Sequence, residues 1–208
     1  MKKYFSNIFL SLFISLLVLS IGNIAFANNY GTHTVKSGDT LWKIAVQYEV
    51  GVSELINSNT QLANPDLIYP GQAINIPNIS DVKSIENEVI NLVNKERQSR
   101  GLSPLSYNWE LSRVARYKSQ DMIDKNYFSH TSPTYGSPFK MMTDFGINYS
   151  YAGENIAMGQ RSATEVMDGW MNSPGHRKNI LSPNYTQIGV GYAVDKNGTP
   201  YWTQMFIK

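Results

Sequence analysis

The chain has 208 residues, of which 18 are basic, 16 are acidic, 42% are hydrophobic and none is Cys. A chain of this length accommodates one or two domains of ~100–200 residues, which excludes a large multidomain enzyme. The lack of Cys excludes disulfide scaffolds, Cys-ligated zinc, thiol catalysis and CxxC redox chemistry. The hydrophobic content is high enough for folded cores.

The formal net charge of +2 comes from the first residues of the chain. Lys2 and Lys3 precede an uncharged, largely apolar run over residues 8–24, and Ala-Phe-Ala follows at 25–27. This order is typical of a secretory signal with an A-x-A cleavage site, so we predict a cleaved signal peptide over residues 1–27. An uncleaved anchor is the alternative, because an apolar run of about 17 residues is at the lower limit for a membrane-spanning helix.

The rest of the chain is electrically neutral, since the other 16 basic residues balance the 16 acidic residues. Neutrality argues against a nucleic-acid partner. Export without Cys suits a secreted protein in the cell wall or spore envelope of a Gram-positive-type bacterium. Contact with a membrane is then expected only through the signal segment before cleavage.

Residues 28–79 have the pattern of a small domain in the order strand, helix, helix, strand. The β-branched stretch at 32–35 predicts the first strand, and alternating Ile residues at 72–77 predict the last. Apolar residues spaced three and four apart from Leu41 to Tyr48 predict the first helix, with Thr40 or Asp39 as its N-cap. Ser53 is the expected N-cap of the second helix.

This segment resembles a LysM module over its full length. The resemblance rests on YGTHTV (30–35), SGDTLWKIA (37–45), Asn57, Asn59 and LIYPGQAINIP (67–77). It implies binding of glycans that contain N-acetylglucosamine, either peptidoglycan or a chitin-like glycan.

Two turns of this domain are the predicted glycan-binding site, because they would lie side by side when the terminal strands pair. The candidate residues are Gly38, Asp39, Thr40, Leu41, Pro65, Asp66, Leu67 and Ile68. For several of them a structural role is the alternative: Leu41 and Leu67 would form a small core together with Ile44, and Asp39 would cap a helix. Trp42 is either a packing residue or a platform for a sugar ring.

From residue 84 to residue 208 the pattern changes to longer helices, after a short polar linker at 77–83. Strands and helices mix without regular βαβ alternation, so we predict an α+β domain. The expected helices cover 84–100, a segment capped by Asn108, 139–145 and 162–172, and the expected strands cover 151–158, 187–194 and 200–207. An Asp-Lys-Asn-Gly turn at 195–198 joins the last two strands as a hairpin.

Two histidines beside turns, His130 and His176, and the acidic residue Glu154 between them are the candidates for chemistry in this domain. Two imidazoles and a carboxylate are the ligands of an open zinc site, or they form a general acid–base set. Each His taken alone is better explained as a polar loop residue or as a hydrogen-bonded structural group. No GxSxG elbow, HExxH helix, P-loop or GxGxxG motif is present in the domain.

Residues 84–208 resemble the bacterial branch of the CAP superfamily, which includes plant pathogenesis-related proteins and insect venom antigens. The motifs are NYFSH (126–130), AGENIA (152–157), VMDGWMNSPGHRKNIL (166–181), IGVGY (188–192) and YWTQ (201–204). The resemblance implies an α-β-α sandwich with a central cleft that holds two His and two acidic residues. In some members this cleft binds a divalent metal, and sterol or lipid binding and proteolysis have been proposed for others.

Carried over by position, His130, Glu154 and His176 match three of the four cleft residues. The fourth position, three residues after the helix Trp, is Ser173 here and not an acid. Glu165 is in the same helix, but eight residues along a helix correspond to about 12 Å. A divalent cation (Zn or Ca) bound by His130, Glu154 and His176, and a hydrogen-bonded cluster without metal, are both left open.

The motifs together predict a secreted, cell-wall-associated protein that binds peptidoglycan through its LysM module. The CAP domain has an unassigned role, with spore or envelope assembly as one setting and a lipid or an envelope protein as a further partner. The alternative is a metal-dependent hydrolase or protease that acts on wall material through His130, Glu154 and His176.

Overall fold

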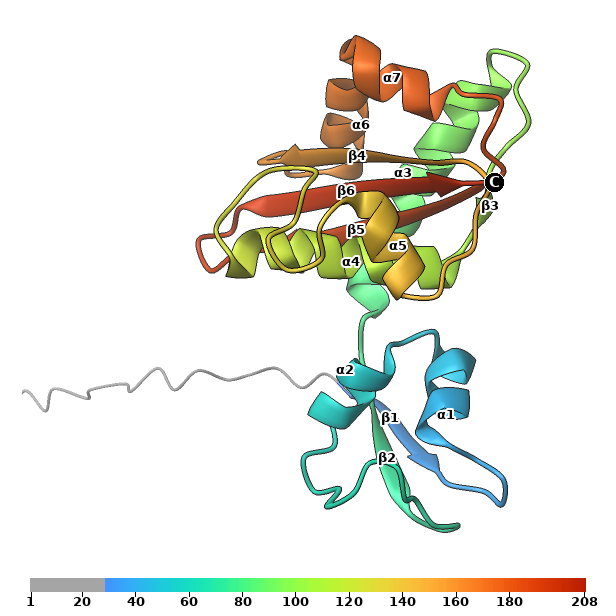
Figure 1. The fold of residues 1–208 in the computed structure, drawn as a ribbon, viewed down its shortest axis with the longest axis vertical. Coiled ribbons are helices and arrows are strands. Elements are labelled where there is room, and N and C mark those ends of the chain that lie inside the picture. The colour runs from blue at the N-terminus through green and yellow to red at the C-terminus, as the bar shows by residue number, and fades with distance from the viewer. Residues whose placement is uncertain (1–28) are drawn as a thin grey trace, which may run out of the picture.

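The computed structural model describes residues 29–208, which form two domains joined by the first turn of a long helix (Figure 1). The predicted signal peptide at 1–27 lies outside the described residues. None of the described helices combines the length and the hydrophobicity that crossing a membrane requires.

The N-terminal domain, residues 29–79, has the predicted order of strand, helix, helix, strand. Its elements are β1 (Asn29–Thr34), α1 (Leu41–Tyr48), α2 (Val52–Asn57) and β2 (Ala73–Pro77). The two strands pair antiparallel, with His33 opposite Ile74. The helices cover one face of this ribbon, and Ile44, Leu55 and Ile74 are fully or almost fully buried between them.

The helix caps of this domain are confirmed in one case and wrong in the other. Thr40 is the N-cap of α1, and its Oγ1 accepts a hydrogen bond from the amide of Lys43 at 3.1 Å. The second helix begins at Val52 after Gly51, so Ser53 is not its cap. A Cβ at position 51 would meet the carboxylate of Glu54, which folds back over this glycine.

The linker is shorter than the predicted range of 77–83, because helix α3 (Ser80–Gln98) already begins at Ser80. Asn78 Oδ1 accepts a hydrogen bond from the Ser80 amide at 3.0 Å, which helps to start the helix early. The first turn of α3 is polar, and Lys83 reaches back to Glu49 of the N-terminal domain at 3.2 Å. Hydrophobic periodicity begins only at Ile85, which is why the sequence pattern placed the helix start too late.

The C-terminal domain, residues 80–208, contains one four-stranded sheet with the order β3-β5-β6-β4. The strands are β3 (Ser106–Tyr107), β4 (Ala152–Met158), β5 (Gln187–Val194) and β6 (Pro200–Ile207). The β5–β6 hairpin and most of β4 agree with the predicted ranges. The two-residue strand β3 was not predicted, and it pairs parallel with β5.

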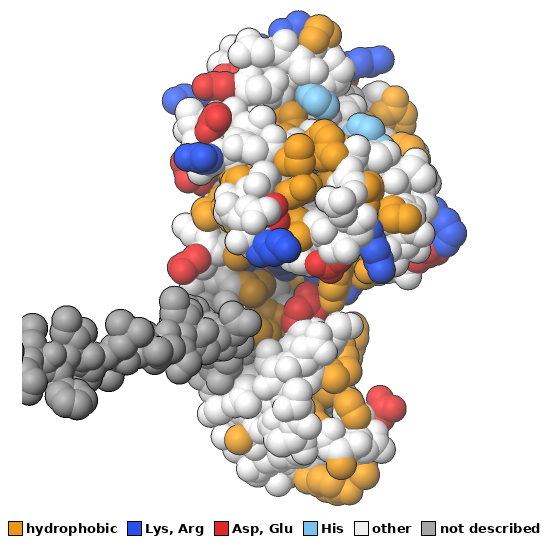
Figure 2. Space-filling model, turned by 90° about the vertical axis from the view of Figure 1, so that its left-hand side faces the viewer, with side chains coloured by type: hydrophobic (Ala, Val, Ile, Leu, Met, Phe, Trp, Pro, Cys, Tyr) orange, Lys and Arg blue, Asp and Glu red, His pale blue; other side chains and the backbone are white. Residues whose placement is uncertain are grey.

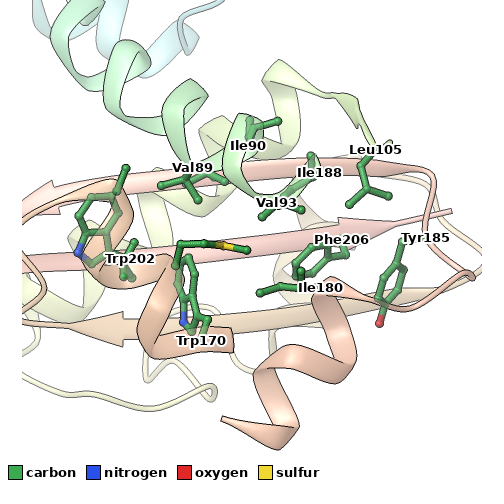
Figure 3. Packing of buried hydrophobic residues seen from close by; sticks show 14 residues of the cluster. Val89, Ile90, Val93, Leu105, Trp170, Ile180, Tyr185, Ile188, Trp202 and Phe206 are labelled. Carbon is green, nitrogen blue, oxygen red and sulfur yellow. The ribbon is translucent and has the colours of Figure 1, made fainter. Parts of the chain in front are cut away.

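Helices cover both faces of this sheet, which confirms the α+β class and gives the expected α-β-α layers. On one face lie α3, α6 (Ala163–Asn172) and α7 (Pro174–Ile180), and on the other lie α4 (Trp109–Asp124) and α5 (Pro138–Asp144). Figure 3 shows the first core, in which Trp170 and Trp202 pack beside Val89 and Phe206. Helix α7 begins where only a turn was expected, so His176 is on a helix.

Two glycines of β5 let α4 lie directly on the sheet. A Cβ at Gly189 would be 2.4 Å from the backbone of Leu111 and Ser112, and a Cβ at Gly191 would be 2.1 Å from the carbonyl carbon of Ala115. Distances this short leave no room for any side chain. The glycines therefore fix the position of α4, whose C-terminal end leads into the loop that carries His130.

Candidate functional site

The two predicted turns of the N-terminal domain line one groove of ≈420 Å³. Seven of the eight predicted glycan-binding residues line it, and Gly38 does not. The full lining is Asp39, Thr40, Leu41, Trp42, Val52, Ile56, Pro65, Asp66, Leu67 and Ile68. Gly38 has a positive φ of 86°, which the turn requires, and its carbonyl oxygen accepts a hydrogen bond from Lys43 Nζ.

The largest apolar side chains of the groove face solvent. Trp42 is 64% exposed and Leu67 is 51% exposed, whereas Leu41 is 5% exposed. Trp42 and Leu67 are therefore not core residues. Leu41 and Ile44, in contrast, are buried in the core of the domain, as the structural alternative predicted. An exposed indole beside apolar turns is a surface on which the apolar face of a sugar ring can stack.

Asp39 holds the first turn in place and does not cap α1. Its Oδ2 accepts hydrogen bonds from the Lys36 amide at 2.8 Å and from His33 Nε2 at 2.9 Å. These bonds favour the charged carboxylate and lower the pKa of Asp39, the His33 bond most of all. The carboxylate therefore organises the turn that leads into the groove.

In the C-terminal domain the structure brings His130 and Glu154 together. His130 Nδ1 lies 2.7 Å from Glu154 Oε1, across 24 residues of sequence. The Glu154 side chain is 1% exposed in the buried strand β4, whereas the His130 side chain is 52% exposed. A buried carboxylate thus orients an imidazole that is open to solvent. Figure 2 shows histidine side chains of this domain, in pale blue, beside apolar surface in orange.

The environment of Glu154 disfavours its negative charge. Burial raises the pKa of the Glu154 carboxyl, and the His130 hydrogen bond and the charge of Lys118 oppose this shift only in part. Glu154 Oε2 is buried and has no hydrogen-bond partner among the described residues. An unpaired buried acceptor costs about 1–3 kcal/mol, so the pair is kept at the expense of stability.

Two residues that were not predicted, Lys118 and Asp121, hold the loop of His130. Lys118 is fully buried, and its Nζ donates to the carbonyl oxygens of Ser129 at 2.7 Å and His130 at 2.9 Å. Asp121 accepts hydrogen bonds from Ser132 Oγ at 2.6 Å and from other groups of the same loop. Lys118 is seven residues after Leu111, so both lie on the buried face of α4. A charged residue on the apolar face of a helix is the sequence signal that could have identified Lys118 as a functional residue.

His176 is near the pair but is not hydrogen-bonded to it. The carbonyl oxygen of His176 accepts a hydrogen bond from Asn155 Nδ2 at 3.1 Å, which ties α7 to β4. Partial burial, and secondarily the charge of His130, lower the pKa of His176. The side-chain amides of Asn155 and Asn179 link β4 at Glu154 to α7. Both residues lie in family motifs, but the sequence analysis did not select them as site residues.

Glu165 lies in the first turn of α6 and does not join this pair. Its amide donates to Oγ of the N-cap Ser162 at 3.1 Å, and its Oε2 accepts a hydrogen bond from the Arg161 amide at 2.9 Å, so Glu165 supports the capped start of the helix. No group of three or more His, Cys, Asp or Glu within residues 29–208 could hold a metal ion. Of the ligands that the resemblance implied, His130 and Glu154 are in contact in the described structure, and a metal site at these residues stays a prediction.

Two family models match the chain. The model of the Cysteine-rich secretory protein family (CAP) matches residues 90–206, and the LysM domain model matches residues 33–77. Both ranges lie inside the predicted domains at 84–208 and 28–79.

Similar proteins fall into two groups, one for each domain. "Uncharacterized protein YkwD" of Bacillus subtilis (strain 168) is 60% identical over 128 residues, which are 62% of this chain and 49% of YkwD. "Spore coat assembly protein ExsA" of Bacillus cereus is 56% identical over 48 residues, which are 23% of this chain and 8% of ExsA. The chain thus spans about half the length of YkwD and a small part of the length of ExsA.

Among solved structures, an extracellular protein with an SCP domain from Bacillus anthracis str. Ames has a TM-score of 0.55 to this chain. It is 36% identical in sequence, and the match covers 67% of this chain and 47% of the other. Since the CAP model also matches more than half of the residues, the chain belongs to the CAP (Cysteine-rich secretory protein) family and carries an additional N-terminal LysM domain.

Proposed function

We propose that this chain is a secreted protein of the bacterial cell envelope that binds peptidoglycan through the groove of its LysM domain. The observation that carries the proposal is the groove itself, with Trp42 and Leu67 exposed between two ordered turns. Acetamido groups are uncharged and need hydrogen bonds and apolar contact, which turns and exposed apolar side chains supply.

The relatives support an envelope location. ExsA is named as a spore coat assembly protein, and the Bacillus anthracis relative is described as extracellular. The predicted signal at 1–27 agrees with export, although these residues are outside the described structure. We therefore propose the cell wall or the spore envelope of a Gram-positive-type bacterium as the site of action.

Sedimentation with purified peptidoglycan tests the proposal, using the chain from residue 28 onward. We expect Trp42→Ala to weaken binding about tenfold, as loss of a central aromatic contact does. Tyr69→Ala is the matched control, because Tyr69 is 59% exposed in the same domain but does not line the groove. Equal binding by wild type and Trp42→Ala, or no sedimentation of the wild type, would contradict the proposal.

A second candidate function is hydrolysis of wall material through His130 and Glu154. The observation that favours it is the 2.7 Å contact between an exposed imidazole and a buried carboxylate, an arrangement that orients a general base. We would incubate wild type and His130→Gln with peptidoglycan and measure the release of reducing ends and free amines. Equal release by both proteins would leave the pair with a structural role.

A further inference from the structure

A second hollow lies next to the groove, at the boundary between the two domains. It has a volume of ≈100 Å³ and we call it the crevice. Trp42 and Val52 line both the groove and the crevice, and Trp109, Glu110 and Arg113 of α4 contribute the CAP side of the crevice. A ligand in the groove can therefore continue past Trp42 to the CAP domain.

Contacts between the domains hold the crevice in place. Tyr117 of α4 donates a hydrogen bond from its hydroxyl to Glu54 Oε2 of α2 at 2.5 Å. Lys83 of α3 pairs with Glu49 at 3.2 Å. In Figure 1, α4 lies on the side of the CAP domain that is nearest to α1 and α2. Both walls of the crevice thus belong to elements with defined partners.

Arg113 is the cation of the crevice, and its Nε lacks a protein partner. Nε of Arg113 is buried without a hydrogen-bond partner among the described residues. The guanidinium carbon lies 5.5 Å from the Phe145 ring centroid and 5.9 Å from the Tyr117 ring centroid, so the aromatic rings hold the group in place. Among the described residues no carboxylate lies within ion-pair distance of Arg113, so its positive charge can attract an anionic ligand in the crevice that it lines.

The size of the crevice limits what can enter it. The crevice, at ≈100 Å³, has about a quarter of the volume of the groove at ≈420 Å³, so it admits a smaller group than the groove does. A carboxylate with its attached carbon is such a small group. Arg prefers carboxylates because its planar fork can form two parallel hydrogen bonds to them.

We propose that Arg113 in the crevice binds a carboxylate on the peptide stem of peptidoglycan, while the glycan backbone occupies the groove. The inference rests on the proposed function and extends it from glycans in general to glycans that carry acidic peptides. Chitin has the N-acetyl groups but no carboxylate, so only the groove recognises it. The crevice thereby makes the two-domain protein selective for peptidoglycan.

Arg113 is the one positively charged residue among the described residues that line the groove and the crevice, and the other charged residues there are acidic. Asp39 and Asp66 line the groove, where the glycan itself is uncharged. Glu110 shares the crevice with Arg113, so it lowers the affinity for any anion. Glu54 is engaged by Tyr117 and does not pair with Arg113 in the structure. Arg113 is thus the attractive group, and Glu110 offers an informative control.

Calorimetric titration of the chain from residue 28 onward with three tetrasaccharides tests the inference. The probes are a peptidoglycan tetrasaccharide with its stem peptides, the same compound with its carboxylates converted to amides, and a chitin tetrasaccharide. We expect Arg113→Gln to weaken binding of the acidic probe about tenfold, a typical loss for a charge-assisted hydrogen bond. Its binding of the other two probes should equal that of wild type.

Glu110→Gln is the matched control, and it should bind the acidic probe at least as tightly as wild type. A loss by Arg113→Gln that is equal for all three probes would assign Arg113 a structural role and overturn the inference. The same affinity of wild type for the acidic and the amidated probe would also overturn it. If wild type binds none of the probes, the proposed function fails and the inference fails with it.

Discussion

The two candidate sites of this protein are built in opposite ways. The groove of the LysM domain consists of two turns of one small domain, and its largest apolar residues, Trp42 and Leu67, face solvent. The His130–Glu154 pair joins a loop to a strand, and its carboxylate is buried below the surface. The first site depends on local backbone conformation, and the second depends on the packing of a whole domain.

The difference follows from the charge that each site contains. The exposed apolar side chains of the groove need no partners, so turns alone suffice to present them. A buried carboxylate needs a hydrogen-bond donor, and the loop that carries this donor needs Lys118 and Asp121. We therefore expect substitutions in the CAP scaffold to have larger effects than comparable substitutions near the groove.

Two glycine substitutions make this contrast measurable. Gly191→Ala should destabilise the CAP domain by about 3 kcal/mol or more, because its Cβ would lie 2.1 Å from the backbone of α4. Gly38→Ala in the groove turn should cost about 1 kcal/mol, since its positive φ is strained for Ala but no atom lies within 4 Å. Urea unfolding of both variants gives the two free energies. Equal losses would contradict the contrast.

The support of the His130 loop should be the next most sensitive feature. Lys118→Met removes the donor to the Ser129 and His130 carbonyls, which should cost about 2 kcal/mol and loosen the loop. Hydrogen exchange at residues 127–134 would detect the loosening. Lys125→Met is the control, because Lys125 is exposed at the end of the same helix. Unchanged exchange in Lys118→Met would mean that the loop is held by Asp121 alone.

The buried carboxylate should also make stability depend on pH. Burial raises the folded-state pKa of Glu154 above its ordinary value of 4.5, so the folded state holds this proton more tightly than the unfolded state. The resulting stabilisation is fully present below pH 4.5 and is lost as pH rises through the raised pKa. We expect wild type to gain stability relative to Glu154→Gln when pH falls from 7 to 5. A constant difference in unfolding free energy would rule out the raised pKa.

The sequence predicted best those features that depend on neighbouring residues. The N-caps Thr40 and Asn108 and the hairpin of β5 and β6 were read from local turn and cap chemistry and are confirmed. The start of α3 was misplaced because its first turn is polar.

Features that depend on tertiary contacts could not be predicted in the same way. His130, Glu154 and His176 were chosen by residue type and family motif, but only the fold shows that the first two form a hydrogen bond and the third does not. The role of Glu165 at the start of α6 and the buried position of Lys118 likewise follow from packing. The Arg113 crevice exists only because two domains meet, and a pattern read within one domain cannot contain it.

Substitutions of the α1 N-cap should have the smallest effect, and they test whether glycan binding depends on the backbone of the turn alone. Thr40 both lines the groove and caps the helix by accepting a hydrogen bond from the Lys43 amide at 3.1 Å. Thr40→Ala should cost about 1 kcal/mol, and Thr40→Ser should retain most of the stability because Ser also caps. If only the backbone of the turn contacts glycan, both variants should bind peptidoglycan like wild type at temperatures where they are folded. Weaker binding by folded Thr40→Ala alone would instead assign the hydroxyl a direct contact with the glycan, and the groove would then depend on side-chain polarity as the CAP site does.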